Sequence, residues 1–402
     1  MFVRLSLSSF IISLILFCGL VMPSVLLYLL PFPQTLFGLI VLLIVCSILF
    51  LGVRKVSPYI YLTIVIILLC SFPAAFYWQN PSVLVFSGYI VLSLLLIGIS
   101  NLRELVCSVE IATDLLIIMG ALSCLSIVYY LNGGQPFFEI SSYVGQPVQF
   151  YIGSFALKVY EGSSTLMRPS AIFDEPGAFA FFIVLCASCR MFLSLDNIKT
   201  WSLLLLGFCT ISLAHTICFV CLIVGSFLFG NSFSFHFKLT STRFLILFSL
   251  LLLLILFRAQ VFVVFSTIGD RLHFDSSTRR LAGDSRSVDF FNLLDILTPT
   301  IFAYGYGGNC FISASACAEL PVGGGNFLLP IFTRGFFATV FYYVYILYTF
   351  IKVYSFRFSY VYLAVLLMFL QRPYVMSNGY SLWAILFLLI PFKIHNHRYS
   401  SL

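Results

Sequence analysis

Charge is scarce in this sequence: Asp, Glu, Lys and Arg make up 9% of its 402 residues, whereas 61% are hydrophobic. A water-soluble domain must cover its outside with polar groups, so this composition excludes a soluble globular protein. Continuous apolar runs long enough to cross about 30 Å of hydrocarbon predict membrane-spanning helices instead. A transmembrane β-barrel is excluded because its strands would alternate apolar and polar residues.

Motifs that bind metals or nucleotides are also missing. The sequence contains no HExxH, no DxD, no GxxxxGK[ST] and no GxGxxG, which are the patterns that hold zinc, metal-bound nucleotides or phosphate groups. We therefore expect no cofactor and no metal. The net charge of +7 does not indicate a nucleic-acid partner, because in so apolar a chain it reflects the charge of the loops.

The apolar runs predict an all-α, polytopic membrane protein in which residues 1–402 form one transmembrane domain of about twelve helices. The expected spans are 8–30, 35–52, 59–76, 82–99, 112–131, 177–193, 200–213, 216–230, 243–265, 328–350, 358–371 and 378–393. Periodicity alone does not divide the run 200–230, and we interpret it as two short helices joined by a tight turn that contains His215.

Basic residues set the expected topology. With both termini in the cytoplasm, a set of twelve Lys and Arg residues falls inside, as the positive-inside rule requires. The set is Arg4, Arg54, Lys55, Arg103, Arg190, Lys199, Lys238, Arg243, Lys352, Arg357, Lys393 and Arg398. Merging 200–230 into one span would move the later members outside, so the charges support the split.

Two long loops, 132–176 and 266–327, are expected on the external side of the membrane. Loops of this length are usually functional or disordered, and these two keep apolar residues throughout, so we expect order. A weak strand-like stretch covers Gln149 to Tyr160, and a short amphipathic helix is expected from Ser287 to Leu297.

The outer side collects arginine, which can hold phosphate oxygens with two parallel hydrogen bonds. The members that we single out are Arg168, Arg286, Arg334 and Arg372. A simpler interpretation is that external arginines pair with nearby acids, which contributes only about 0–1 kcal/mol. Arg334 differs, because it begins an apolar run and charge at membrane depth usually faces a polar cavity.

The stretch MRPSAIFDEPGAF, residues 167–179, places Asp174 and Glu175 directly before a helix that Pro176 begins. One interpretation is that these carboxylates only cap the helix, although Ser, Thr, Asp or Asn would cap better than Glu. The other is that Glu175 is a general base beside Arg168. His215 is a second candidate base, and a structural role for it stays open.

These motifs resemble those of Wzy-type O-antigen and exopolysaccharide polymerases. The resemblance rests on RPSAIFDEPGAFAFF, on the paired short spans around His215, on GDSR followed by YGYGGN, and on Asn326 ahead of TRGFFATVFYY. It implies a glycosyltransferase of the bacterial inner membrane that faces the periplasm. Such an enzyme joins oligosaccharide repeat units carried on undecaprenyl diphosphate, without metal or nucleotide sugar.

The resemblance also implies roles for individual residues. Arg168, Arg286, Arg334, Arg372 and Asp174 would bind the substrate. Asp284 would orient Arg286, and Glu175 or His215 would act as the base. The implied partners are the lipid-linked oligosaccharide, membrane lipid and a chain-length regulator protein.

Two other functions remain as alternatives. An O-antigen ligase uses the same donor with a lipid A core acceptor, and the late loop does contain His273. A flippase or transporter for the lipid-linked sugar would carry charge near the midplane, whereas here the expected mid-span regions are nearly free of charge.

Overall fold

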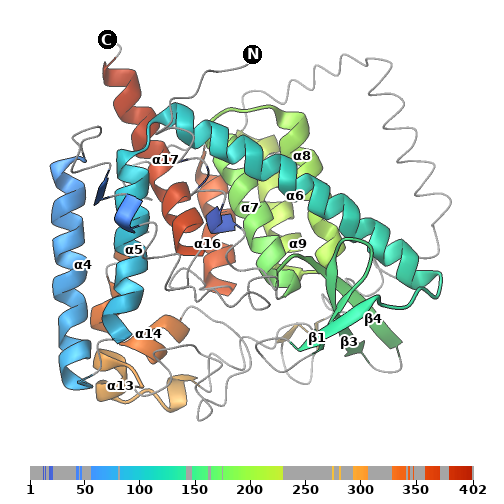
Figure 1. Cartoon of the computed structure of the whole chain (residues 1–402), viewed down its shortest axis with the longest axis horizontal. Coiled ribbons are helices and arrows are strands. Elements are labelled where there is room, and N and C mark those ends of the chain that lie inside the picture. Colours follow the sequence, from blue (N-terminus) through green and yellow to red (C-terminus); the bar gives the residue numbers. More distant parts are fainter. Residues whose placement is uncertain are drawn as a thin grey trace.

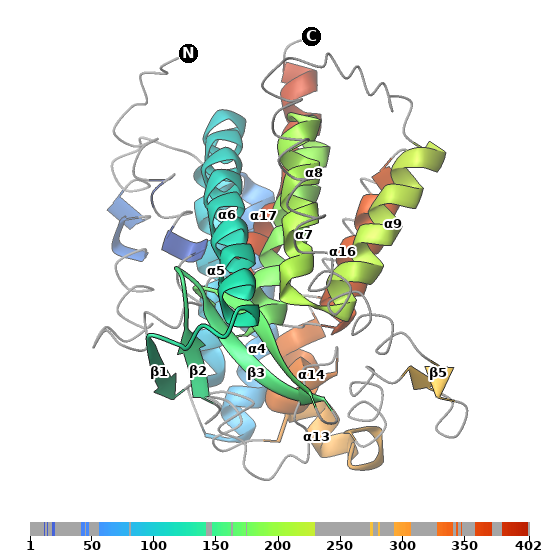
Figure 2. The same cartoon turned by 90° about the vertical axis from the view of Figure 1, so that its right-hand side faces the viewer.

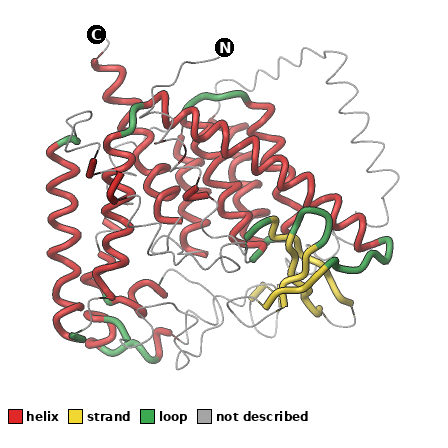
Figure 3. The backbone as a smooth tube through the Cα atoms, viewed as in Figure 1, coloured by secondary structure: helices red, strands yellow, loops and turns green. Residues whose placement is uncertain are grey.

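The computed structural model describes residues 56–79, 82–141, 147–161, 164–173, 175–229, 293–306, 328–340, 358–371 and 380–400, with pieces of 12–20, 42–47, 274–275, 280–281 and 343–347. Most of this part of the chain is helical, and it adds a small sheet that an all-α fold does not contain (Figures 1 and 3). The expectation of an all-α fold is therefore corrected to a mainly helical fold with a sheet.

The longer helices lie where the sequence predicts spans. They are α4 (Pro58–Tyr77), α5 (Ser82–Ile99), α6 (Leu102–Leu131), α7 (Pro176–Phe192), α8 (Asn197–Leu206), α9 (Leu213–Phe229), α16 (Ser359–Gln371) and α17 (Tyr380–Ser400). Within the described residues, α4 and α6 are long and apolar enough to cross a membrane. The expected spans 8–30, 35–52 and 243–265 fall mostly or wholly outside the described residues.

Local sequence explains where several helices begin. Pro58 and Pro176 occupy the first helical positions of α4 and α7, where a missing N–H costs nothing. At the start of α6, Asn101 accepts from the Glu104 N–H while the Glu104 side chain accepts from the Asn101 N–H. This reciprocal cap fixes the first turn ten residues ahead of the expected span, and it makes α6 longer than predicted.

The core centres on α7, in which every residue except Met191 is buried. A helix that is apolar on all sides must be surrounded by protein, and α7 packs against α6, α8, α9, α16 and α17 (Figure 1). In contrast, α4 exposes most of its large apolar side chains, as expected of a helix in contact with lipid or a partner.

The first long loop folds into a four-stranded antiparallel sheet. Its strands are β1 (Phe138–Ser141), β2 (Pro147–Phe150), β3 (Phe155–Glu161) and β4 (Ser164–Ala171), in sequence order. The strand-like stretch expected from Gln149 to Tyr160 therefore spans parts of two strands. Strands β5 (Phe274–Asp275) and β6 (Arg280–Leu281) pair separately.

The second long loop contributes short helices. Residues 293–295 are helical inside the helix expected from Ser287 to Leu297, whose first residues lie outside the described part. This loop also contains α13 (Pro299–Tyr304), and α14 (Leu329–Arg334) follows it at the start of the next expected span. The expected span 328–350 is interrupted after α14, because Gly335 has a φ of 83° before residues 336–340 resume a helix.

The four-stranded sheet, α13 and α14 lie at one end of the long helices, which we call the sheet end (Figures 1 and 2). The opposite end holds the start of α6, the connection from α7 to α8 and the C-terminal part of α17. Described basic residues that the topology assigns to the cytoplasm belong to this opposite end: Arg103, Arg190, Lys199 and Lys393. Lys393 donates to the carbonyl oxygens of Gly98 (2.8 Å) and Ser100 (2.7 Å), where α5 ends.

Candidate functional site

Arg168 lies in β4 opposite Leu157 of β3, with its side chain half-buried. Its Nε donates to the carbonyl oxygen of Thr210, 3.3 Å away. Thr210 ends the 3-10 turn η1 (Gly207–Thr210), which connects α8 towards α9. The arginine therefore joins the sheet to the connection between two helices of the core.

Each of the two segments joined by this contact contains a residue with a strained backbone angle. Ile211, next to Thr210, has a φ of 48°, and Ala171, between Arg168 and Glu175, has a φ of 56°. Positive φ is rare for a residue with a side chain, above all for a β-branched one, and it costs on the order of 1–3 kcal/mol. Strain of this kind gathers at functional sites, so it supports the region around Arg168 as a candidate site.

Glu175 occupies the N-cap position of α7, as the sequence predicts, with extended backbone angles of φ −145° and ψ 152°. Its side chain makes no capping hydrogen bond. The carboxylate is half-buried at the end of the segment that follows Arg168. Its position is set by Pro176 and by the turn at Ala171, and capping of α7 does not account for the choice of a carboxylate here.

His215 lies inside the first turn of α9, whereas we expected it in the turn between the two helices. Its ring is fully buried, and its Nε2 is 2.8 Å from the carbonyl oxygen of Leu204. A carbonyl can only accept, so Nε2 carries the proton and Nδ1 carries a lone pair. No described residue provides a partner for Nδ1. The ring fills the space beside Gly207, where an alanine would collide with it.

Arg334 ends α14 and has different neighbours. The residue is only 8% exposed, and its backbone packs against Gly305, directly after α13. The remaining predicted site residues, Asp174, Asp284, Arg286 and Arg372, lie outside the described residues. The structure thus places four predicted residues at the sheet end. Arg168, Glu175 and His215 belong to elements that pack together around β4 and η1, whereas Arg334 belongs to α14, which lies below α4 and α5 (Figure 1).

The sheet is attached to α6 by polar contacts that the sequence does not reveal. The Ser123 and Ser154 hydroxyls are 3.0 Å apart, and the Ser126 hydroxyl donates to the Ile152 carbonyl oxygen at 3.0 Å. The buried Tyr151 hydroxyl donates to the side-chain oxygen of Gln149 at 2.7 Å. Burial, with smaller contributions from Tyr130 and Glu139, raises the pKa of Tyr151 to about 12, so this donor keeps its proton at neutral pH.

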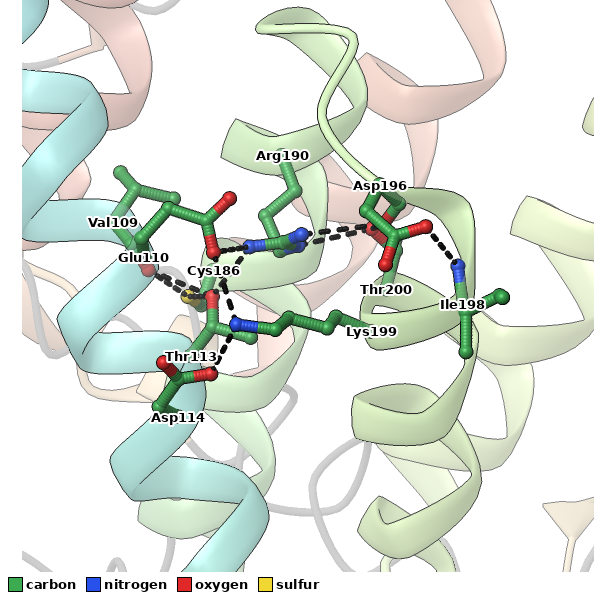
Figure 4. Close-up of polar contacts among 10 residues, drawn as sticks. All are labelled: Val109, Glu110, Thr113, Asp114, Cys186, Arg190, Asp196, Ile198, Lys199 and Thr200. Carbon is green, nitrogen blue, oxygen red and sulfur yellow. Dashed lines mark hydrogen bonds and ion pairs between the residues drawn. The ribbon is translucent and has the colours of Figure 1, made fainter. Parts of the chain in front are cut away.

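A second polar cluster, which the sequence reasoning missed, lies near the opposite end (Figure 4). Arg190 of α7 is fully buried, and its guanidinium donates to Glu110 of α6 at 2.7 Å and to the Thr200 hydroxyl of α8 at 3.0 Å. It also donates to the Thr113 hydroxyl at 3.2 Å and to the Asp196 carbonyl oxygen at 3.2 Å. One guanidinium therefore joins three helices.

Lys199 extends this cluster towards the surface. Its ammonium lies 2.6 Å from Asp114 and 3.6 Å from Glu110. The two cations face two carboxylates, so the charges of these ion pairs balance. The only signal in the sequence is the spacing of Glu110 and Asp114, which places both acids on one face of α6. Their partners are about 80 residues away and cannot be found from spacing.

Among the described residues, no three His, Cys, Asp or Glu side chains gather as a metal site. Neither protein-family models nor curated proteins nor solved structures match this chain. A functional assignment therefore depends on the geometry described above and on the sequence motifs.

Proposed function

We propose that this chain is a polymerase of lipid-linked oligosaccharide repeat units, held in the bacterial inner membrane by about twelve helices. Its sheet end faces the periplasm and both termini are cytoplasmic. The observation that carries the proposal is the pairing of Arg168 with Thr210 in the strained segment that leads to Glu175. A cation and a carboxylate on one short segment match the needs of glycosyl transfer from a lipid diphosphate.

The reaction requires a base and a site for the leaving group. Glu175 takes the proton from a hydroxyl of the acceptor sugar, and that oxygen attacks the anomeric carbon of the donor. The bond from this carbon to the diphosphate oxygen breaks, and undecaprenyl diphosphate leaves with the electron pair. Arginines at the sheet end, Arg168 and Arg334 among them, stabilise the developing negative charge, and holding both substrates at the membrane surface favours the reaction.

Between the two candidate bases, the geometry favours Glu175. A general base must come within about 2.6–3.2 Å of the proton that it removes. The His215 ring is fully buried, and its Nε2 is engaged with the Leu204 carbonyl. Glu175 is only half-buried and stands at the start of α7, at the sheet end, so a substrate meets this residue more readily than the fully buried ring.

The membrane topology has its own support. α4 and α6 have the length and apolarity of membrane spans, and described basic residues of the expected cytoplasmic set belong to the end opposite the sheet. A polymerase working on periplasmic repeat units needs its reactive groups on the other side from these basic residues. The sheet end meets that requirement.

The direct test supplies the purified protein, in lipid discs, with undecaprenyl-diphosphate-linked repeat units from its host. EDTA is present and nucleotide sugar is omitted, and the products are separated on a gel. A ladder of lengths still attached to lipid is the expected result. In a parallel reaction with lipid A core added, transfer of a single block to this acceptor would indicate a ligase instead. Movement of the lipid-linked unit across the membrane without new bonds would indicate a transporter.

A further inference from the structure

Two short helices at the sheet end repeat each other in sequence and in structure. α13 reads PTIFAY and α14 reads LPIFTR, and a glycine follows each. Both are six residues long, begin with a proline in the first two positions, and contain Ile-Phe at equivalent places. The glycines Gly305 and Gly335 have φ angles of 80° and 83°, and each donates to the carbonyl four residues before it, at 2.8 and 2.7 Å.

The two helix ends contact each other through these glycines. A Cβ at Gly305 would lie 2.7 Å from the Gly335 nitrogen and 2.8 Å from the Arg334 nitrogen. A Cβ at Gly335 would lie 2.5 Å from the carbonyl carbon of Tyr304 and would overlap the Ala303 oxygen. A side chain is therefore excluded twice at each position, by the positive φ and by the opposite backbone.

The equivalent positions before the glycines are occupied by Tyr304 and Arg334. Tyr304 attaches the pair to α4, because its ring stacks on Tyr77 with centroids 4.4 Å apart and its carbonyl accepts from the Trp78 indole at 3.0 Å. Arg334 ends the other helix and is nearly buried. One half of the repeat is thus fixed to a long helix, and the other half carries a guanidinium.

We propose that this glycine junction positions Arg334 as the anion-binding group for a diphosphate, with Gly305, Gly335 and Trp78 as positioning residues. The inference rests on the proposed function for the identity of the anion. A buried guanidinium cannot easily change its position, so the backbone that carries it must be fixed. Direct contact between the backbones of the two helix ends fixes it, and this contact leaves no room for a side chain, which is why both positions are glycine.

The test measures the binding of inorganic diphosphate to the full-length protein in lipid discs, by calorimetry. Gly305→Ala and Gly335→Ala are expected to weaken binding by about tenfold, as Arg334→Ala does, because small displacements of a positioned group have large effects. Two controls are available in the same chain. Gly133 has a φ of 83° with open space around it, and Gly88 has open space and no such φ, so alanine at either should leave the affinity unchanged.

A double variant separates positioning from a general structural role. If the glycine acts through Arg334, then Gly335→Ala added to Arg334→Ala weakens binding no further. Additive losses, equal losses in the Gly133→Ala control, or no diphosphate binding by the intact protein would each overturn the inference. Failure of the polymer ladder together with the expected binding pattern would remove the proposed function and leave the anion site.

Trp78→Phe covers the case in which the glycine variants do not fold. It removes the indole N–H that holds the Tyr304 carbonyl and reduces the side chain to one ring, and the position directly follows α4, away from Arg334 in the chain. Diphosphate binding should weaken by about threefold, because the hydrogen bond is lost while an aromatic ring stays at this position. An affinity equal to that of the intact protein would contradict the role of the anchor.

Discussion

Arg168 donates from its Nε to the carbonyl oxygen of Thr210, 42 residues later in the chain, at 3.3 Å. This bond attaches the last strand of the sheet to the connection between α8 and α9. Residues at positive φ stand next to it on both segments, Ala171 and Ile211. The side chain of Arg168 is therefore held by a bond to a second segment, and positive φ angles occur in both segments, as is typical of functional sites.

Replacing Arg168 should remove activity more than stability. We expect Arg168→Ala to lower the polymerisation rate by about 10²–10³-fold, the usual effect of losing one donor to a developing charge. Arg168→Lys should restore only part of the rate, because a single ammonium lacks the planar fork. Initial rates of ladder formation measure both.

A matched control lies on the same sheet. Lys158 is on β3, opposite Met167, so strand alternation directs it to the other face from Arg168. Lys158→Ala removes one positive charge from the sheet and should leave the rate nearly unchanged. Equal losses in the two alanine variants would show that the sheet contributes only a general positive potential.

Glu175→Gln distinguishes a base from a helix cap. Gln keeps the shape of Glu and one oxygen acceptor, and the residue is only half-buried, so this change should alter the free energy of unfolding by less than about 0.5 kcal/mol. Loss of a general base should slow polymerisation by about 10²–10⁴-fold. Thermal unfolding of the purified variant, measured beside its initial rate, checks both parts. A small rate loss that follows a loss of folded protein would reduce Glu175 to a structural role.

Some features of the fold could be predicted from the sequence, and others could not. The start of α7 could be predicted from Pro176, since a proline at the first helical position is a local signal. The division between α8 and α9 required charge, because the apolar run was continuous. The sheet was only partly visible, because its strands are short and Gln149 to Tyr160 crosses a turn. Local patterns find helix starts, and they do not find pairings between strands.

Other features depend on contacts that no local pattern contains. The pairing of Arg190 with Glu110 joins residues 80 positions apart, and from the sequence Arg190 reads only as a cytoplasmic charge. The break at Gly335 was also missed, because one glycine in a long apolar run is common in membrane helices. Its signal is the repeat of Ile-Phe and glycine at equal spacing in α13 and α14, which becomes evident once their backbones are seen in contact.

His215 is expected to support stability. His215→Phe keeps an aromatic ring and removes the donor to the buried Leu204 carbonyl, which should cost about 1–3 kcal/mol of unfolding free energy. The rate per folded molecule should stay close to that of the intact protein. Denaturant titration and active-fraction measurements test this. A collapse of the rate with unchanged stability would instead make His215 the base and displace Glu175 from that role.

The second polar cluster, around Arg190, contains one buried and one exposed ion pair, and their contributions to stability can be compared. Glu110→Gln removes the carboxylate that faces the fully buried guanidinium at 2.7 Å. An uncompensated buried charge typically destabilises a protein by about 3–5 kcal/mol. Lys199→Met breaks the pair with Asp114, in which both side chains are about half exposed, and should cost only about 0–1 kcal/mol.

The double variant Glu110→Gln, Arg190→Met tests whether the penalty comes from the stranded charge. Removing both partners leaves no buried charge, so the double variant should be more stable than Glu110→Gln alone, although Thr113 and Thr200 lose a hydrogen-bond partner. Unfolding in mixed detergent measures the free energies of unfolding of the intact protein, of Glu110→Gln and of the double variant. A double variant less stable than Glu110→Gln would mean that the pairing of the guanidinium with Glu110 is secondary. The guanidinium would then hold the three helices together mainly through its bonds to Thr113, Thr200 and the Asp196 carbonyl.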